Sequence, residues 1–533
     1  MTRTIVVGGG ASGAALAARL SEDSDREVTL IEAGEASGAY PADLLDGSSV
    51  RGAMPGHPAN WAYLGHLTPD LPYTVARGRI LGGSSTINGG YFVRARRGDL
   101  DAWARTAGPE WSYDRALPVW RALESDLDFG DAPPHGASGP MPVRRPDASN
   151  PATRAFGAAA QELGFAYEAD KNGDEPPGVG PVPANVIDGV RVNTGLAYIE
   201  PVRSRLNLRI LGSTRVHRVR FQGARAVGVE SDSGFLGADD VVLCAGAIGS
   251  AQLLLVSGVG PRVHLEGLGI RVVSDLPVGE SFSDHPDIAI GWRATRRIMD
   301  TAETMAFPAA LNFDSSGDAG RHPDGDLEIL LSVKTLGYLL TGSARTATSG
   351  VAAVLRHPIR VTRAVTGISA RRAVSQLATR NDLQLTVGLQ APTGRGVLSL
   401  LSDDPLQPPC IDYRYLAEAD DRERMRIGIR TAAQLLRSAA FDGLFHTLTE
   451  LDDPALEDDK ALDAWMLSHL GTAIHMCGTA PVGPVVDSVG RVHGVTGLRV
   501  VDTSILPAVP SRGPFATAVF LGELLGRRMR DEG

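Results

Sequence analysis

The chain opens with a glycine-rich turn between a strand and a helix, and this turn limits the possible folds more than any other feature. Residues 4–7 are all β-branched and, apart from Thr4, apolar, which predicts a buried strand, and residues 8–13 follow with the spacing G-x-G-x-x-G. A helix is expected over residues 14–20 and a second strand over residues 27–31. This order of elements predicts a parallel sheet covered by helices, as in Rossmann-type folds.

The same turn predicts a dinucleotide site. Glycines let the backbone approach a pyrophosphate, and the amides at the start of the next helix hold its negative charge. Glu32 ends the second strand, where its carboxylate is placed to accept hydrogen bonds from a ribose. A ligand-free glycine turn and a solvated Glu32 are the alternatives, and the flanking strand and helix favour the binding site.

A second glycine-rich loop indicates a flavin rather than a nicotinamide. Residues 78–88 read Gly-Arg-Ile-Leu-Gly-Gly-Ser-Ser-Thr-Ile-Asn. A flavin needs more contacts, because its ring, ribityl chain and pyrophosphate are all held at once. A Ser/Gly connector without a ligand is the alternative.

The order of elements indicates two domains in a chain of 533 residues. Further elements of the first domain are expected at residues 206–211, 225–230, 240–243, 498–501 and 517–530. Segments rich in Gly, Pro and Asp, expected to be mostly irregular, are residues 35–77 and 130–151. The middle of the chain mixes an expected strand, residues 384–390, with an expected helix, residues 420–439. We predict an α/β fold, α+β overall: a Rossmann-type FAD-binding domain of residues 1–285 and 470–533, with an inserted substrate domain of residues 286–469 built on an antiparallel sheet and helices.

Composition limits the classes of binding partner and the cellular compartment expected for this chain. The net charge of −10 argues against a nucleic-acid partner. Three cysteines cannot form a disulfide framework and lack metal-ligand spacing, so no metal is predicted. The N-terminus has no secretory signal, and a cytoplasmic location is expected. Residues 241–260 carry no charge but contain several glycines, which favours a buried strand and helix over a transmembrane segment.

One region breaks the acidic pattern. Residues 329–381 contain no Asp or Glu but eight Lys and Arg side chains. A solvated surface or internal contacts with acidic segments would account for them. The alternative is a patch that meets anionic lipid or an acidic partner, which would place the protein at the inner face of the membrane.

Four segments carry a resemblance to a known family. Residues 78–88, continuing through Phe92, Ala95 and Asp101, resemble the first signature of the glucose–methanol–choline (GMC) oxidoreductases. Residues 246–260 resemble the second, departing only at Ala251. Residues 276–286 and 491–502 are similar to two further family segments, in the family's order.

The resemblance implies bound FAD and an alcohol dehydrogenase activity similar to that of choline dehydrogenases. The residues expected along the cofactor, including those of the two glycine loops, are Gly8, Gly10, Ala11, Ser12, Gly13, Glu32, Ala33, Gly82, Gly83, Ser84, Asn88, Gly89, Val216, Ala245, Asp502 and Phe515. Some relatives attach the flavin through a histidine before the Asn of the first signature. Ile87 occupies that place, so non-covalent FAD is predicted.

His475 is the candidate catalytic base. Oxidising an alcohol means removing the hydroxyl proton while the carbon-bound hydrogen leaves as hydride, and a histidine suits the proton step. A lone histidine is more often structural, but residues 475–479, His-Met-Cys-Gly-Thr, resemble the family's catalytic loop. His285 and His493 lie in family-like segments and are expected to have structural roles.

The chain departs from the family at Phe515. Relatives place a His or Asn there, near the closing helix, to help hold the substrate oxygen, and phenylalanine can neither donate nor accept a hydrogen bond. Either His475 works alone, another group substitutes, or the chemistry differs. Arg512, Tyr91 and Cys477 are the candidate substitutes.

Several functions remain open. The leading one is oxidation of a small alcohol with electrons passed to an acceptor other than oxygen. The alternatives are an oxidase that makes hydrogen peroxide, a lyase or decarboxylase on the same fold, and a catalytically silent FAD-binding protein. Residues 87–92, 127–130 and 135–140 also resemble the mycofactocin-associated dehydrogenase branch, which implies a redox peptide as substrate.

Overall fold

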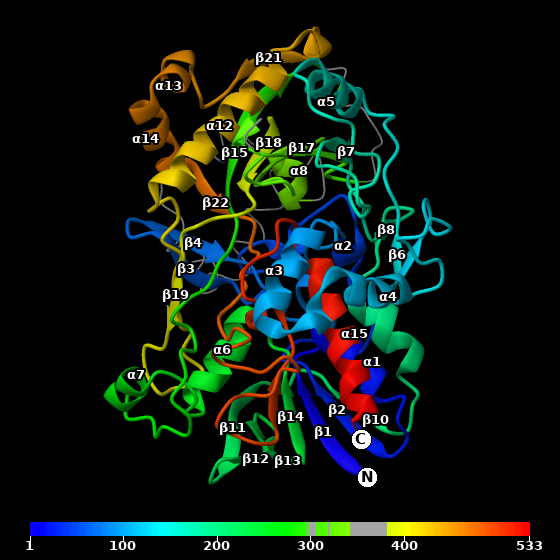
Figure 1. The fold of residues 1–533 in the computed structure, drawn as a ribbon, viewed down its shortest axis with the longest axis vertical. Helices are drawn as coiled ribbons and strands as arrows, with labels where there is room; N and C mark the ends of the chain where they lie inside the picture. Colours follow the sequence, from blue (N-terminus) through cyan, green and yellow to red (C-terminus); the bar gives the residue numbers. More distant parts are fainter. Residues whose placement is uncertain (296–297, 299–304, 318–319, 342–380, 533) are drawn as a thin grey trace.

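The computed structural model describes residues 1–295, 298, 305–317, 320–341 and 381–532. Its elements form two sheet-centred regions (Figure 1). A parallel sheet lies at the lower end of the view, and both chain termini lie beside it. An antiparallel sheet with long helices against it forms the other end.

The parallel sheet has five strands, each parallel to its neighbours. In spatial order they are β10 (Leu208–Leu211), β2 (Arg26–Ile31), β1 (Thr2–Val7), β14 (Asp240–Leu243) and β23 (Leu498–Val500). Helices α1 (Ala11–Leu20) and α15 (Phe515–Asp531) pack against each other beside this sheet (Figure 1). Gly522 permits their close approach, because a methyl group added there would lie 2.3 Å from the carbonyl oxygen of Ser12.

The second sheet is antiparallel. Its strands, in order, are β21 (Phe445–Leu448), β15 (Pro286–Ala294), β18 (Leu383–Leu389), β17 (Leu327–Ser332), β16 (Ala309–Phe313) and β7 (Val179–Pro181), and β22 (Leu470–Thr472) also pairs with β15. Helix α12 (Ala419–Leu436) packs on β17 and β18, with Gly428 against Val387 and Leu327. The predicted fold class is confirmed. The predicted domain limits stay a prediction, and β7 and β22, outside residues 286–469, belong to this sheet.

The remaining elements connect and flank these sheets. They are α2 (Ala42–Leu45), β3 (Tyr63–Thr68), β4 (Leu71–Val75), α3 (Arg97–Ala107), α4 (Tyr113–Leu123), β5 (Glu124–Asp126), β6 (Met141–Val143), α5 (Pro151–Glu162), β8 (Val186–Ile187), β9 (Val190–Arg191), β11 (Val216–Gln222), β12 (Arg225–Ser231), β13 (Gly234–Gly237), α6 (Gly246–Val256), α7 (Arg262–Gly267), α8 (Leu336–Thr341), β19 (Val397–Ser399), β20 (Cys410–Asp412), α13 (Asp453–Glu457) and α14 (Asp459–His469).

Two expected loops contain strands. Residues 35–77 include the β3–β4 hairpin, which joins β19 and β20 in a four-stranded sheet. Residues 130–151 include β6, which pairs with β5. The predictions of irregular structure hold for most of each segment and fail at these strands, which their pairing partners stabilise although a Gly- and Pro-rich composition does not indicate them.

The described helices include none long and apolar enough to cross a membrane. Residues 241–260 form β14 and α6, as predicted. Most of the basic region lies outside the described residues, at 342–380, so contact with lipid or an acidic partner stays a prediction.

Candidate active site

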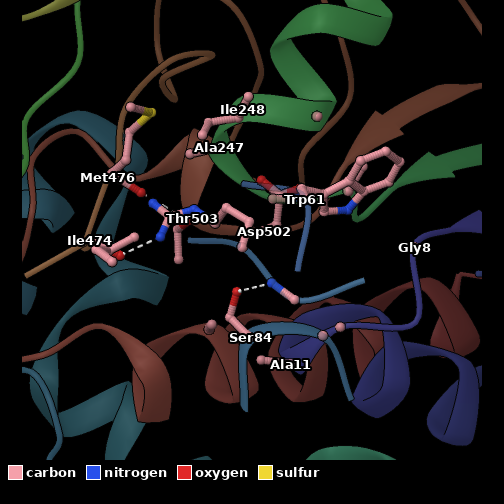
Figure 2. Close-up of a pocket in the computed structure, with 18 of the residues that line it drawn as sticks. Gly8, Ala11, Trp61, Ser84, Ala247, Ile248, Ile474, Met476, Asp502 and Thr503 are labelled. Carbon is pink, nitrogen blue, oxygen red and sulfur yellow. Dashed lines mark hydrogen bonds between the residues drawn. The ribbon is translucent and has the colours of Figure 1, made fainter. Parts of the chain in front are cut away.

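A cavity of about 590 Å³ lies at the carboxyl edge of the parallel sheet. Gly8, Glu32 and Cys244 directly follow β1, β2 and β14, and all three line it. Ligands of open parallel sheets bind at this edge. Figure 2 shows Gly8, Ala11, Ser84 and Asp502 arranged around the cavity.

The first glycine turn forms the floor of the cavity. Gly8 has φ +105°, and a side chain there would lie 2.5 Å from the carbonyl oxygen of Cys244. Gly10 caps α1, and no side chain bonds to that helix end. The residues of the turn that line the cavity are Gly8, Gly10, Ala11 and Ser12. Gly13 lies behind it, where an added methyl group would lie 1.9 Å from the carbonyl oxygen of Gly8, so it serves the packing of helix on strand.

Glu32 presents a buried carboxylate to the cavity, and Ala33 lines the wall beside it. Its oxygens accept hydrogen bonds from the backbone N–H groups of Gly9, at 3.0 Å, and Gly34, at 2.8 Å. Burial nevertheless raises the pKa of Glu32 from 4.5 to about 7. Each carboxylate oxygen accepts one backbone hydrogen bond and keeps a second lone pair, which a ribose hydroxyl can use.

The second glycine loop meets the first. Gly83 has φ +55°, and a methyl group added there would lie 2.7 Å from the Cα of Gly10. The residues of this loop and its next neighbour that line the cavity are Gly78, Gly83, Ser84, Ser85, Ile87, Asn88 and Gly89. The Ser84 hydroxyl accepts a hydrogen bond from the N–H of Gly78 at 3.1 Å (Figure 2). Gly82 lies outside the lining and has φ +88°, a conformation that lets the loop turn.

Four predicted residues from distant segments also line the cavity: Val216, Ala245, Asp502 and Phe515. The Asp502 carboxylate is already bonded within the chain. Its oxygens accept from the N–H of Gly246 at 2.9 Å and from the hydroxyls of Ser250, at 2.6 Å, and Ser504, at 2.5 Å. Asp502 therefore fixes the start of α6 at the cavity wall.

His475 lies on the cavity wall, in contact with His285. The two Nδ1 atoms are 2.9 Å apart, and the rings meet edge to face at 87°. His285 Nε2 lies 3.0 Å from the carbonyl oxygen of Pro510. Burial lowers the pKa of both imidazoles, that of His285 to about 4, so both are neutral near pH 7.

The outer edge of His475 faces Gly513 and Tyr91. A methyl group added at Gly513 would lie 3.6 Å from His475 Nε2 and 3.5 Å from Tyr91 Cδ1. All three residues line the cavity, so Nε2 is open to it. His493 is remote from this point, with Nε2 3.0 Å from the carbonyl oxygen of Gly483.

Two of the candidate substitutes for a polar residue at position 515 are hydrogen-bonded elsewhere, and the third, Arg512, has Nε and Nη2 atoms without a partner among the described residues but does not line the cavity. The Tyr91 hydroxyl donates to Glu328 at 2.7 Å, and the Cys477 thiol donates to the carbonyl of His475 at 3.1 Å. Arg512 is buried, donates to the carbonyl of Ser511 at 2.6 Å and does not line the cavity. Phe515 packs edge to face on Phe92, 5.1 Å between ring centres.

Sequence reasoning missed several cavity residues. Trp61, labelled in Figure 2, contacts the guanidinium groups of Arg79 and Arg215, whose Cζ atoms lie 5.0 and 5.2 Å from its ring centre. It belongs to the segment that was expected to be loop. Arg77 and Ile474 were also missed, and no local pattern marks them. The His285 contact with His475 joins positions 190 apart, which only the fold reveals.

The cavity suits the predicted dinucleotide. Two touching glycine loops leave the start of a helix without a side-chain cap, and the buried Glu32 carboxylate, with one backbone donor on each oxygen, can accept further hydrogen bonds. Sequence models of the family described as GMC oxidoreductase match residues 2–287 and 392–522. The chain belongs to the GMC oxidoreductase family.

Relatives and solved structures agree with this family. The chain is 37% identical to an uncharacterized GMC-type oxidoreductase of Rhodococcus erythropolis, over 97% of this chain and 96% of the relative. It is 33% identical to an oxygen-dependent choline dehydrogenase of Serratia proteamaculans, over 99% of this chain and 95% of that one. Pyridoxine 4-oxidase from Mesorbium loti has the same fold, with TM-score 0.85, 27% identity and 99% coverage of both chains.

As a GMC oxidoreductase, the chain binds FAD and acts on alcohol-type donors. The residues that would hold the cofactor are those of the two glycine loops with Glu32, while His475 faces the same cavity. These matches do not bear on the mycofactocin-associated branch, which stays a prediction.

Proposed function

We propose that this GMC oxidoreductase oxidises an alcohol to a carbonyl compound with His475 as the base that takes the hydroxyl proton. FAD, when bound, supplies the hydride acceptor. The observation that carries the proposal is the neutral His475 imidazole, whose Nε2 faces the cavity while Nδ1 contacts His285.

The hydrogen bonds of His285 indicate which ring nitrogen of His475 carries the proton. The Pro510 carbonyl can only accept, so His285 Nε2 carries a hydrogen and donates to it. A neutral His285 then has its lone pair on Nδ1, which accepts from His475 Nδ1–H. This leaves the lone pair of His475 on Nε2, where an alcohol hydroxyl reaches it from the cavity. The chain thus presents a base in the required tautomer without a charged partner.

Because Phe515 cannot form a hydrogen bond, we expect His475 to take the hydroxyl proton without help from position 515. No polar side chain stands at the family's second position, the Tyr91 hydroxyl and the Cys477 thiol are bonded elsewhere, and Arg512 does not line the cavity. We therefore expect the alkoxide that develops during oxidation to interact chiefly with the proton on His475 Nε2.

Anaerobic titration of the holoenzyme with a panel of alcohols tests the function. Choline and pyridoxine belong in the panel, because the names of the relatives specify them. Bleaching of the flavin absorbance by at least one alcohol is expected. A lyase or a silent FAD-binding protein would leave the oxidised spectrum unchanged.

The electron acceptor is a separate proposal. An acceptor other than oxygen is the leading expectation, although the sequence does not separate it from an oxidase, and the names of two relatives, an oxygen-dependent dehydrogenase and an oxidase, favour oxygen. Admitting air to the reduced enzyme separates them. Slow reoxidation with little hydrogen peroxide supports the other acceptor, and fast stoichiometric peroxide formation supports an oxidase. Bleaching by reduced mycofactocin would support the peptide substrate.

We also propose that FAD is bound non-covalently, since Ile87 stands where a linking histidine would lie and lines the cavity. Acid precipitation should release all of the yellow colour into the supernatant. Colour that stays with the precipitate would contradict the proposal.

A further inference from the structure

The residue before His475 has an unusual backbone conformation. Ile474 has φ +63°, in the left-handed region. Among the residues that the structure describes, it is the only β-branched one there. A β-branched side chain is rarely found in this region, because its branched Cβ crowds the backbone. Such strain persists only where surrounding contacts hold it, and it gathers at functional sites.

Contacts on both sides of Ile474 hold this turn. Its N–H donates to the hydroxyl of Thr472 at 3.0 Å, and that hydroxyl is fixed by Tyr415 at 2.8 Å. Its carbonyl accepts from Arg77 Nη1 at 2.6 Å, drawn as the dashed line at Ile474 in Figure 2. Arg77 Nη1 also lies 3.3 Å from the carbonyl oxygen of Ala76, which limits its freedom.

The segments on either side of the turn are tied to residues 283–285. The N–H of Ala473 donates to the carbonyl of His285 at 3.1 Å, and Cys477 exchanges two backbone hydrogen bonds with Ser283, at 2.9 and 3.0 Å. Between them, the N–H of His475 donates to Asp284 Oδ1 at 2.6 Å. With both flanks fixed, the direction of His475 Nε2 depends on the backbone at Ile474 together with the contact between Nδ1 and His285.

We propose that Arg77 and Thr472 hold Ile474 in its left-handed conformation, and that this held turn directs His475 Nε2 into the cavity. The inference rests on the proposed role of His475. Arg77 is then a positioning residue that acts through the Ile474 carbonyl. An electrostatic role is the competing account, because Arg77 also lines the cavity.

A double-mutant cycle separates the two accounts. The rate constant of anaerobic flavin reduction is measured for the wild-type holoenzyme, Arg77→Met, Ile474→Gly and the double variant. Arg77→Met should be slower by about 30-fold, whereas Ile474→Gly should stay within about 5-fold of wild type, because glycine adopts positive φ readily. The double variant should also stay within about 5-fold of Ile474→Gly, since an unstrained turn no longer needs its anchor.

A matched control is Arg395→Met. Arg395 Nη1 likewise donates to backbone carbonyls, of Pro392, Thr393 and Gly394, at 2.8 to 3.3 Å, but it lies outside the cavity lining. The flavin of the Arg395→Met variant should be reduced at the wild-type rate. If Arg77→Met lowers the rate constant of flavin reduction equally in the wild type and in Ile474→Gly, the proposal is overturned and the charge of Arg77 accounts for its role.

A crystal structure of the Arg77→Met holoenzyme shows the backbone conformation at Ile474 without relying on catalytic activity. Ile474 should relax to negative φ, and the His475 imidazole should leave the neighbourhood of Gly513. Retention of the positive φ and of the imidazole position would overturn the proposal. If no alcohol reduces the wild-type flavin, the proposed function fails, and this structure still decides the role of the turn.

Discussion

Binding of FAD should depend on pH through Glu32. Burial raises the pKa of Glu32 to about 7, above its ordinary 4.5, although two backbone N–H groups donate to it. Near pH 6 the cofactor-free protein therefore holds a proton on this carboxyl. Hydroxyl donors from a ribose would favour the ionised form, so FAD binding should release that proton.

The size of the effect follows from the two pKa values. If bound FAD returns the pKa of Glu32 to 4.5, affinity should fall as pH drops below 7 and be about 30-fold weaker at pH 5.5 than at pH 8. Proton release should peak at about 0.9 per FAD near pH 5.8 and fall to about 0.1 at pH 8.

Calorimetric titration of FAD into the cofactor-free protein, in buffers of different ionisation enthalpy, measures both quantities. Glu32→Gln is the matched variant, since glutamine keeps the size of the side chain and one carbonyl acceptor but cannot ionise. It should bind FAD more weakly at pH 8 and lose the pH dependence. An unchanged slope in Glu32→Gln, or no proton release by the wild type near pH 6, would refute the reasoning.

Two further predictions concern the contact between the two glycine loops and the stability of the fold. Gly83→Ala should weaken FAD binding by at least about 10-fold in a fluorescence titration, because the added methyl group meets Gly10 at 2.7 Å; Gly157→Ala, whose methyl group meets nothing within 4 Å, is the control, and equal affinities would count against it. Burial lowers the pKa of His135, but hydrogen bonds to the carboxylates of Asp126, Asp170 and Glu124 outweigh it and raise this pKa from 6.5 to about 10. The protonated His135 therefore stabilises the fold fully below pH 6.5, and this stabilisation is lost as pH rises through 10. In urea unfolding, His135→Gln should lower the unfolding free energy by about 3 kcal/mol at pH 7 and by much less above pH 10, and a pH-independent difference would contradict this.

The sequence predicted the elements around the cavity because the signals for them are local. The glycine turn at residues 8–13, the strand that Glu32 follows and the closing helix each follow from spacing and periodicity within a short segment. Their assembly around one cavity is observed. Gly13 and Gly82 have the right spacing but lie outside the lining, since spacing alone does not distinguish a glycine that faces a ligand from one that lets two backbones pack.

The rest could not be predicted because it depends on contacts between distant segments. The β3–β4 hairpin is composed like a loop, and its partner strands come more than 300 residues later. His285 resembles a structural residue in its own segment, and its contact with His475 exists only after folding. The positive φ of Ile474 runs against the preference of its side chain, so local propensity points the wrong way there.

The central claim is that neutral His475 takes the hydroxyl proton as the alcohol is oxidised. Stopped-flow flavin reduction without oxygen, with one alcohol that bleaches the wild-type enzyme, tests it most directly. His475→Ala should keep its FAD and be reduced at least about 100-fold more slowly at pH 7, with partial recovery at high pH where hydroxide replaces the lost base. Reduction of that variant within about 3-fold of the wild-type rate at pH 7 would contradict the account.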